Sequence, residues 1–101
     1  MPKLYEYFGL IVFFYSNEHE PIHVHGRYHG RESKAEIFYE NVELKDIIYS
    51  SVKNKWQLES NEMRKFKILV ERYHNDIVSK WIDFFVYNKH IDSVTITEKL
   101  D

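Results

Sequence analysis

The spacing of apolar residues changes near Ser60 and divides the chain into two kinds of structure. From there on, apolar side chains recur at steps of three and four residues: Met63, Phe66, Leu69, Val70, Tyr73, Ile77, Trp81, Phe84 and Phe85. This period is typical of an amphipathic helix, and Ser60 is of a residue type that caps helix N-termini. A straight helix over residues 61–87 would be about 40 Å long, so we expect a bend at His74–Asp76.

Before Ser60 the sequence alternates with the period of two that strands show. Residues 8–15 are apolar at both alternating sets, as in a central strand covered on both faces. Residues 34–40 alternate like a half-buried strand. Residues 42–49 fit a fourth strand, but a short helix would also fit, and the pattern alone does not decide between them. Residues 92–98 are β-branched and alternating, which predicts a last strand at an edge of the sheet.

Together these patterns predict a single α+β domain over residues 1–101, because a chain of this length can form one hydrophobic core. We expect an antiparallel three- to four-stranded β-meander at about residues 8–48, packed against a long C-terminal helix or helix pair at about 60–88. A short final strand is expected at about 93–98.

Charge and cysteine content limit the classes of function. Lys and Arg number 14 and Asp and Glu number 16, a formal net charge of -2, so any contact with RNA must be local. Cysteine is absent, which excludes cysteine-ligated zinc. The apolar run at residues 8–15 is much shorter than a membrane span, and the first residues do not resemble a signal peptide. We therefore expect a cytoplasmic protein that does not associate with a membrane.

The stretch from Glu18 to Arg31 concentrates the residues that can carry chemistry. It holds four of the six histidines, together with Pro21, which favours a turn. A strand beginning at His23 would place alternate residues on one face: His23, His25, Arg27, His29 and Arg31. Glycines at 26 and 30 weaken this assignment, and the far end of the stretch also fits a loop that begins near His29.

One interpretation of this stretch is a metal site. Its carboxylate and imidazole groups suit Zn, Ni, Mn or Fe. The candidate ligands are Glu18, His19, His23 and His25.

A second interpretation is metal-free acid–base chemistry, such as the cleavage of RNA at the 2'-hydroxyl. His23 and His25 are the catalytic candidates, because imidazole exchanges protons near neutral pH. The candidates for binding the phosphate groups of the substrate are Arg27, His29 and Arg31.

A third interpretation is structural: Pro21 and the histidines would build a stiff turn without activity. Separately, the aromatic content of 17% can exceed what one small core covers. Surplus apolar surface of this kind would favour a homodimer or a dedicated protein partner.

The stretch EHEPIHVHGRYHG resembles the motif of a small bacterial family called domain of unknown function 4160. The family's acidic-His-x-Pro-Pro-His-Phe-His-Ala segment is matched by Glu18, His19, Pro21, His23 and His25. Further matches are Tyr28, Gly30, Ala35, Ile37, His74 and Trp81. The resemblance covers residues 4–40 and, more loosely, 62–82. The sequence departs from the family pattern at Ile22, Val24 and Gly26 and in a longer segment over 41–60.

Some members of that family are described as the toxin of a type II toxin–antitoxin pair. The resemblance therefore implies a toxin-like protein that acts on RNA or another translation target, with a small antitoxin-like protein as its cognate partner. The competing expectation is a non-enzymatic module whose histidine-rich turn binds a divalent metal or a protein.

Overall fold

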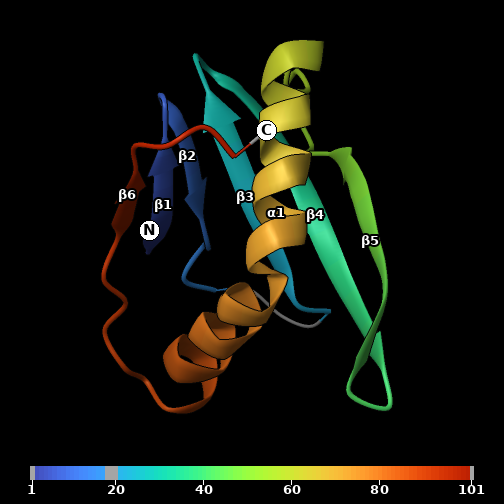
Figure 1. The fold of residues 1–101 in the computed structure, drawn as a ribbon, viewed down its shortest axis with the longest axis vertical. Coiled ribbons are helices and arrows are strands. Elements are labelled where there is room, and N and C mark those ends of the chain that lie inside the picture. Colours follow the sequence, from blue (N-terminus) through green and yellow to red (C-terminus); the bar gives the residue numbers. More distant parts are fainter. Residues whose placement is uncertain (1, 18–20, 101) are drawn as a thin grey trace.

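The protein forms one six-stranded sheet with a helix across one face (Figure 1). This computed structural model describes residues 2–17 and 21–100. Its elements are β1 Lys3–Tyr7, β2 Leu10–Phe13, β3 His23–Tyr28, β4 Arg31–Glu40, β5 Glu43–Ser51, α1 Ser60–Trp81, a π-helical turn Ile82–Val86 and β6 Val94–Ile96. The predicted α+β class is therefore confirmed.

The strand order β5-β4-β3-β2-β1-β6 makes the first five strands an antiparallel meander. β6 joins the outer side of β1 in the parallel direction, so the sheet is mixed. The predicted last strand is thus present at an edge. The undecided segment at residues 42–49 is strand, and residues 52–59 lead from β5 to the helix.

The N-terminal strand β1 was not predicted from the sequence. The expected strand at residues 8–15 begins only at Leu10, because Phe8 and Gly9 form a tight turn with φ of 46° and 88°. β2 nevertheless lies in the interior of the sheet, between β1 and β3, as expected for that strand.

The helix bends where the sequence predicts a break. Tyr73 has non-helical angles (φ -108°, ψ 17°), one residue before the expected position. Ser60 is the first helical residue, and Glu59 occupies the cap position without a side-chain cap bond, so the assignment of Ser60 as the cap is wrong by one residue. No helix in the described part of the chain is long and apolar enough to cross a membrane.

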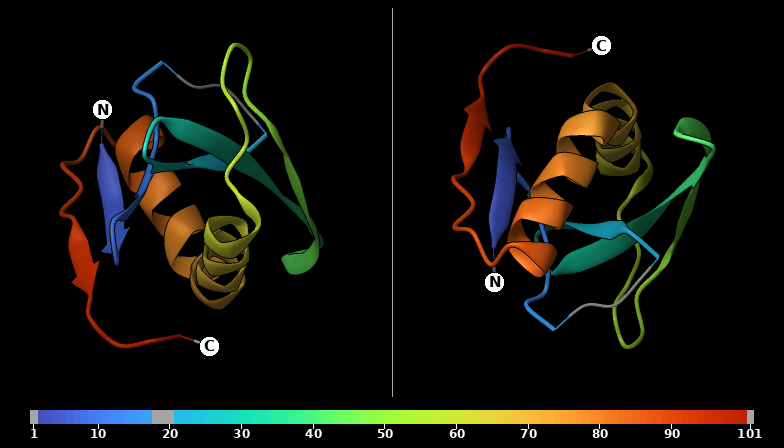
Figure 2. Two further views of the ribbon diagram at one scale, coloured as in Figure 1. Left: turned by 90° about the horizontal axis from the view of Figure 1, so that it is seen from above. Right: turned by 90° about the horizontal axis from the view of Figure 1, so that it is seen from below.

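The core lies between α1 and the concave face of the sheet, which curves around the helix (Figure 2). Val24 and Ala35 of the sheet and Leu69 of the helix are fully buried in it. Gly26 allows the closest approach, since a Cβ there would lie 2.7 Å from Cδ1 of Phe66. This glycine therefore serves packing, and β3 continues through it without a bulge.

Candidate functional site

A two-residue turn sets the register of the hairpin that carries the site. His29 and Gly30 have φ of 48° and 78°, and positive values at both central residues are the mark of a type I' turn. The turn pairs Arg27 with Glu32 across the two strands and Tyr28 with Arg31. Paired residues point to the same face and neighbours along a strand point to opposite faces. Arg27 and Glu32 therefore share one face, and Arg31 lies on the other.

Glu32 is the centre of a buried polar cluster on the face away from α1. Its side chain is fully buried, and its carboxylate accepts three hydrogen bonds. Tyr15 donates its hydroxyl to Oε2 at 2.8 Å, His25 donates Nδ1–H to Oε2 at 3.1 Å, and Arg27 donates Nε–H to Oε1 at 3.3 Å. A buried carboxylate is tolerated only when it is paired and hydrogen-bonded in this way.

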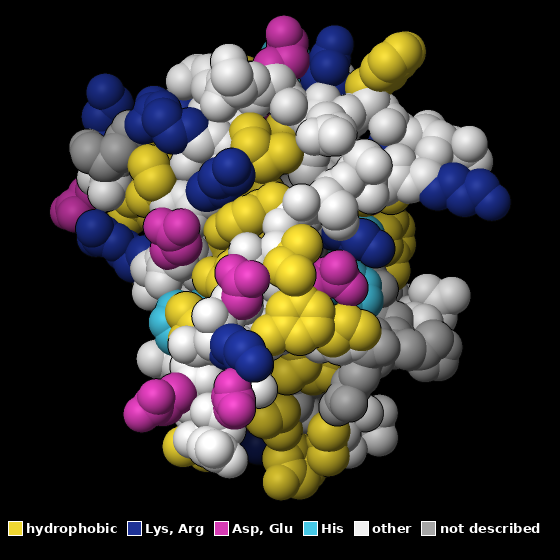
Figure 3. All heavy atoms as spheres, turned by 90° about the vertical axis from the view of Figure 1, so that its right-hand side faces the viewer, with side chains coloured by type: hydrophobic (Ala, Val, Ile, Leu, Met, Phe, Trp, Pro, Cys, Tyr) yellow, Lys and Arg dark blue, Asp and Glu magenta, His cyan; other side chains and the backbone are white. Residues whose placement is uncertain are grey.

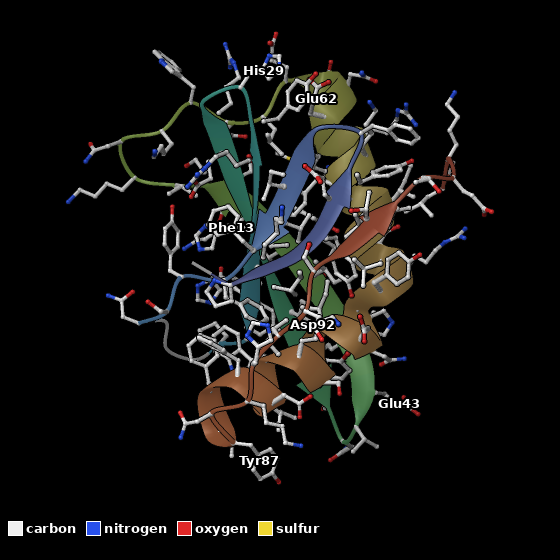
Figure 4. The ribbon with its side chains drawn as sticks, turned by 90° about the vertical axis from the view of Figure 1, so that its left-hand side faces the viewer. Phe13, His29, Glu43, Glu62, Tyr87 and Asp92 are labelled. Atoms are coloured by element: carbon white, nitrogen blue, oxygen red, sulfur yellow. The ribbon has the colours of Figure 1, made fainter. Side chains whose placement is uncertain are left out.

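Aromatic rings hold the His25 imidazole in position. Phe13 of β2 stacks on it with ring centroids 5.5 Å apart, and Tyr15 meets it edge-on at 4.6 Å. The Arg27 guanidinium lies 4.8 Å from the centroid of the Phe13 ring, a cation–π contact. Figure 4 shows Phe13 on the side of the sheet away from α1. The cluster is therefore rigid, because each polar group is fixed by both a ring and the carboxylate.

The hydrogen bonds also determine the tautomers of the two central histidines. Nδ1 of His25 contacts the Glu32 carboxylate, and Nδ1 of His23 contacts the carbonyl oxygen of Pro21 at 2.8 Å. Both partners are acceptors, so Nδ1 carries the proton in each ring and the lone pair of each neutral imidazole lies on Nε2. The two rings are 5.4 Å apart. Nε2 is the atom that would act as a base or ligate a metal; Nε2 of His25 is buried, whereas His23 is only half-buried.

Burial and the hydrogen bond to Glu32 raise the pKa of the Tyr15 hydroxyl, while the nearby Arg27 guanidinium opposes the rise. Tyr15 is therefore protonated at neutral pH and acts as a donor to the carboxylate. Solvent reaches the cluster from one side: the Arg27 side chain is 36% exposed, whereas His25 is only 5% exposed. A ligand would meet Arg27 and the half-buried His23 before it met Glu32.

The expected single face of five residues does not hold for its last two members. His29 is in the turn, where its ring stacks on Tyr28 at 4.1 Å. Arg31 points to the opposite face and donates to the carbonyl oxygen of Gln57 at 3.0 Å. The physical reason is the tight turn, which ends β3 at Tyr28 and reverses the chain.

Two members of the predicted metal set, Glu18 and His19, lie outside the described residues. Within residues 2–17 and 21–100, no group of three His, Cys, Asp or Glu side chains is placed to hold a metal ion. Of the proposed ligands, the structure therefore places only His23 and His25, and it places them side by side.

Sequence reasoning missed Glu32 and Tyr15. In the sequence, Glu32 lies in a segment that also fits a loop, and Tyr15 fits the apolar pattern of the strand expected at residues 8–15. The His-Gly dipeptide at 29–30 could have revealed Glu32, because a two-residue hairpin turn there pairs it with Arg27.

Fold and site together define a class: a small α+β domain whose β3–β4 hairpin holds a carboxylate–histidine pair flanked by arginine and tyrosine. A family model described as "Domain of unknown function (DUF4160)" matches residues 9–82. The chain belongs to this family. The comparisons with curated proteins and with solved structures found no match.

Proposed function

We propose that the protein is a toxin-like component of a toxin–antitoxin module and acts on RNA or another translation target through His23, His25 and Arg27. The observation that supports this most directly is the engagement of both Nδ1 atoms by acceptors. It leaves each imidazole with its basic lone pair on Nε2, as general acid–base catalysis requires.

The groups around the two rings have separate roles in this proposal. Arg27 is the group with a charge suited to a phosphate, and a third of its side chain is open to solvent. His23 is more exposed than His25 and is the one that meets the substrate first. Glu32 is a positioning residue, because it orients His25 through Nδ1.

Growth arrest on induced expression tests this proposal. The variant carrying His23→Ala and His25→Ala should no longer arrest growth, while His90→Ala should arrest it like the wild type. His90 is a matched control because its side chain is 86% exposed and pairs with the exposed Asp92. Circular dichroism would show that both variants fold. Arrest by the folded double variant would remove the two histidines from the mechanism.

The proposed partner is a small antitoxin-like protein or a second copy of the chain. β5 is an edge strand, and exposed apolar side chains gather over it (Figure 3). Val42 is 96% exposed in the turn before β5, and Leu44 and Ile48 on the strand are 39% and 46% exposed. An exposed edge with apolar side chains supports association through strand addition.

Metal binding is the second candidate function. A histidine that ligates a metal commonly donates its other ring N–H to a carboxylate or a backbone carbonyl, and His25 and His23 do so to Glu32 and Pro21. Nitrogen donors of this kind suit Zn, Ni, Mn or Fe. Glu18 and His19 remain the further candidate ligands.

Elemental analysis of protein purified without an affinity tag tests metal binding. One equivalent of metal is expected in the wild type and in His90→Ala, and none in the variant lacking His23 and His25. Absence of metal from the wild type, even after incubation with each of the four ions, would contradict this candidate.

A further inference from the structure

Two hairpin turns and the start of α1 meet at one end of the molecule (Figure 1). The β1–β2 turn contains Phe8 and Gly9, and the β3–β4 turn contains His29 and Gly30. The turns are in contact, since a Cβ on Gly9 would lie 2.9 Å from Cε1 of Tyr28. This end lies beyond the polar cluster and is not part of the site described above.

Phe8 is strained and exposed in the first of these turns. Its φ of 46° is in the left-handed region, which a bulky side chain rarely adopts, and type I' turns favour Asn at this position. The ring is nevertheless 51% exposed. Burial in the core therefore does not explain why a large aromatic residue is present at this strained position.

The second turn presents a second ring in the same way. His29 has φ of 48° and is exposed, and its imidazole lies parallel to the Tyr28 ring, with 4° between the planes. One face of His29 is thus supported by tyrosine. Each turn at this end displays an aromatic group on a left-handed residue.

Cationic side chains line a hollow beside Phe8. A hollow of about 350 Å³ beside it is lined by Tyr7, Phe8, Asn61, Arg64, Lys65 and Lys99. Among the described residues that line it there are three cations and no carboxylate. In a protein with a formal net charge of -2, the hollow is a local cluster of cations of the kind that a contact with RNA would need, and one carboxylate, Glu62, lies next to it and accepts a hydrogen bond from Asn61.

We infer that this end of the molecule binds single-stranded RNA. The inference rests on the proposed function, which leaves open whether the target is RNA or another part of translation, and it names RNA as the target. Exposed rings that stack on bases, next to cations that follow the phosphates, are the recurring features of single-strand binding. The binding groups are Phe8, His29, Arg64, Lys65 and Lys99. β3 connects them to the polar cluster: His29 follows His25 by four residues, or roughly 13 Å at the strand rise.

Fluorescence anisotropy with a short 2'-O-methyl oligouridine tests this inference, because the methyl group prevents the 2'-oxygen from attacking the adjacent phosphate and the strand therefore stays intact. Phe8→Asn removes the ring but retains a residue suited to the turn, so the fold is preserved. We expect this variant to bind roughly 5- to 160-fold more weakly than the wild type. Affinity falls with rising salt, and Lys65→Gln should make this dependence weaker: the negative slope of log affinity against log salt should decrease in magnitude by about 0.7.

Matched controls lie at the opposite end of the molecule. Tyr87 is 63% exposed, and Figure 4 shows it far from His29. Tyr87→Ala and Lys89→Gln should bind like the wild type. Equal affinities for the wild type, Phe8→Asn and Tyr87→Ala would overturn the inference, and so would the absence of binding by the wild type.

The growth assay separates this inference from the proposed function. If the double variant of His23 and His25 loses growth arrest while Phe8→Asn binds RNA normally, only the inference fails. If Phe8→Asn loses RNA binding while the double variant still arrests growth, the catalytic proposal fails and the RNA-binding end remains.

Discussion

Replacing Glu32 with Gln should strongly destabilise the protein. The carboxylate accepts from Tyr15, His25 and Arg27, and the amide that replaces it has one acceptor oxygen and an NH2 group that faces donors. Removing one partner of a buried ion pair costs about 3–5 kcal/mol. The Arg27 side chain is 36% exposed, so water can hydrate it in part when the carboxylate is removed. We therefore expect a loss at the lower end of this range, about 3 kcal/mol of the free energy of unfolding. For a domain of this size that corresponds to a fall in Tm of roughly 12–24 °C.

Urea unfolding followed by circular dichroism measures this loss. The matched control is Glu40→Gln, because Glu40 pairs with Lys45 at 3.0 Å but both side chains are more than half exposed. A surface pair of this kind contributes about 0.5 kcal/mol or less. If Glu32→Gln and Glu40→Gln lowered the free energy of unfolding equally, with unchanged m values, the central role of the buried carboxylate would be refuted.

Two further predictions concern the tyrosines and the close packing of β3. Burial raises the pKa of Tyr5 and Tyr49 above the ordinary value near 10. Above pH 10 the unfolded chain therefore binds fewer protons than the folded one. The free energy of unfolding should then fall by about 1.4 kcal/mol per pH unit for each tyrosine. A free energy of unfolding that is the same at pH 9 and at pH 11 would contradict this. Gly26→Ala should lower the free energy of unfolding by about 1–3 kcal/mol, because the added Cβ would lie 2.7 Å from the buried Phe66 ring. An unchanged free energy of unfolding in urea would contradict this and would mean that the ring can shift freely.

The sequence predicted the secondary structure correctly where buried residues recur at the regular spacing of a helix or a strand. Phe66, Leu69 and Ile77 are buried at helical spacing, and the pattern therefore predicted α1. The turn at Phe8 was missed because turn signals are small or polar residues, and this turn begins with an aromatic. Without that signal, residues 8–15 read as one strand, and the pattern does not predict β1, which precedes the turn.

The candidate site was only partly predictable, for a related reason. Charged residues are usually solvent-exposed, so a glutamate in a sequence is predicted to lie on the surface. No neighbouring residue in the sequence indicates that Glu32 is fully buried. Its burial depends on three donors, two from β3 and one from the segment after β2, and such contacts are set by the register of the strands. His23 and His25 were found because their spacing is local, while the carboxylate that orients one of them was not.

The same turn determines both the polar cluster and the RNA-binding end that we infer. Because a one-residue change of register moves every side chain of a strand to the other face, the two-residue turn at His29 is what places Glu32 beside Arg27. The left-handed angles that make this turn possible also display the His29 ring on Tyr28. The hairpin therefore couples the position of the buried carboxylate to the presentation of the exposed ring, and a change in the turn would disturb both.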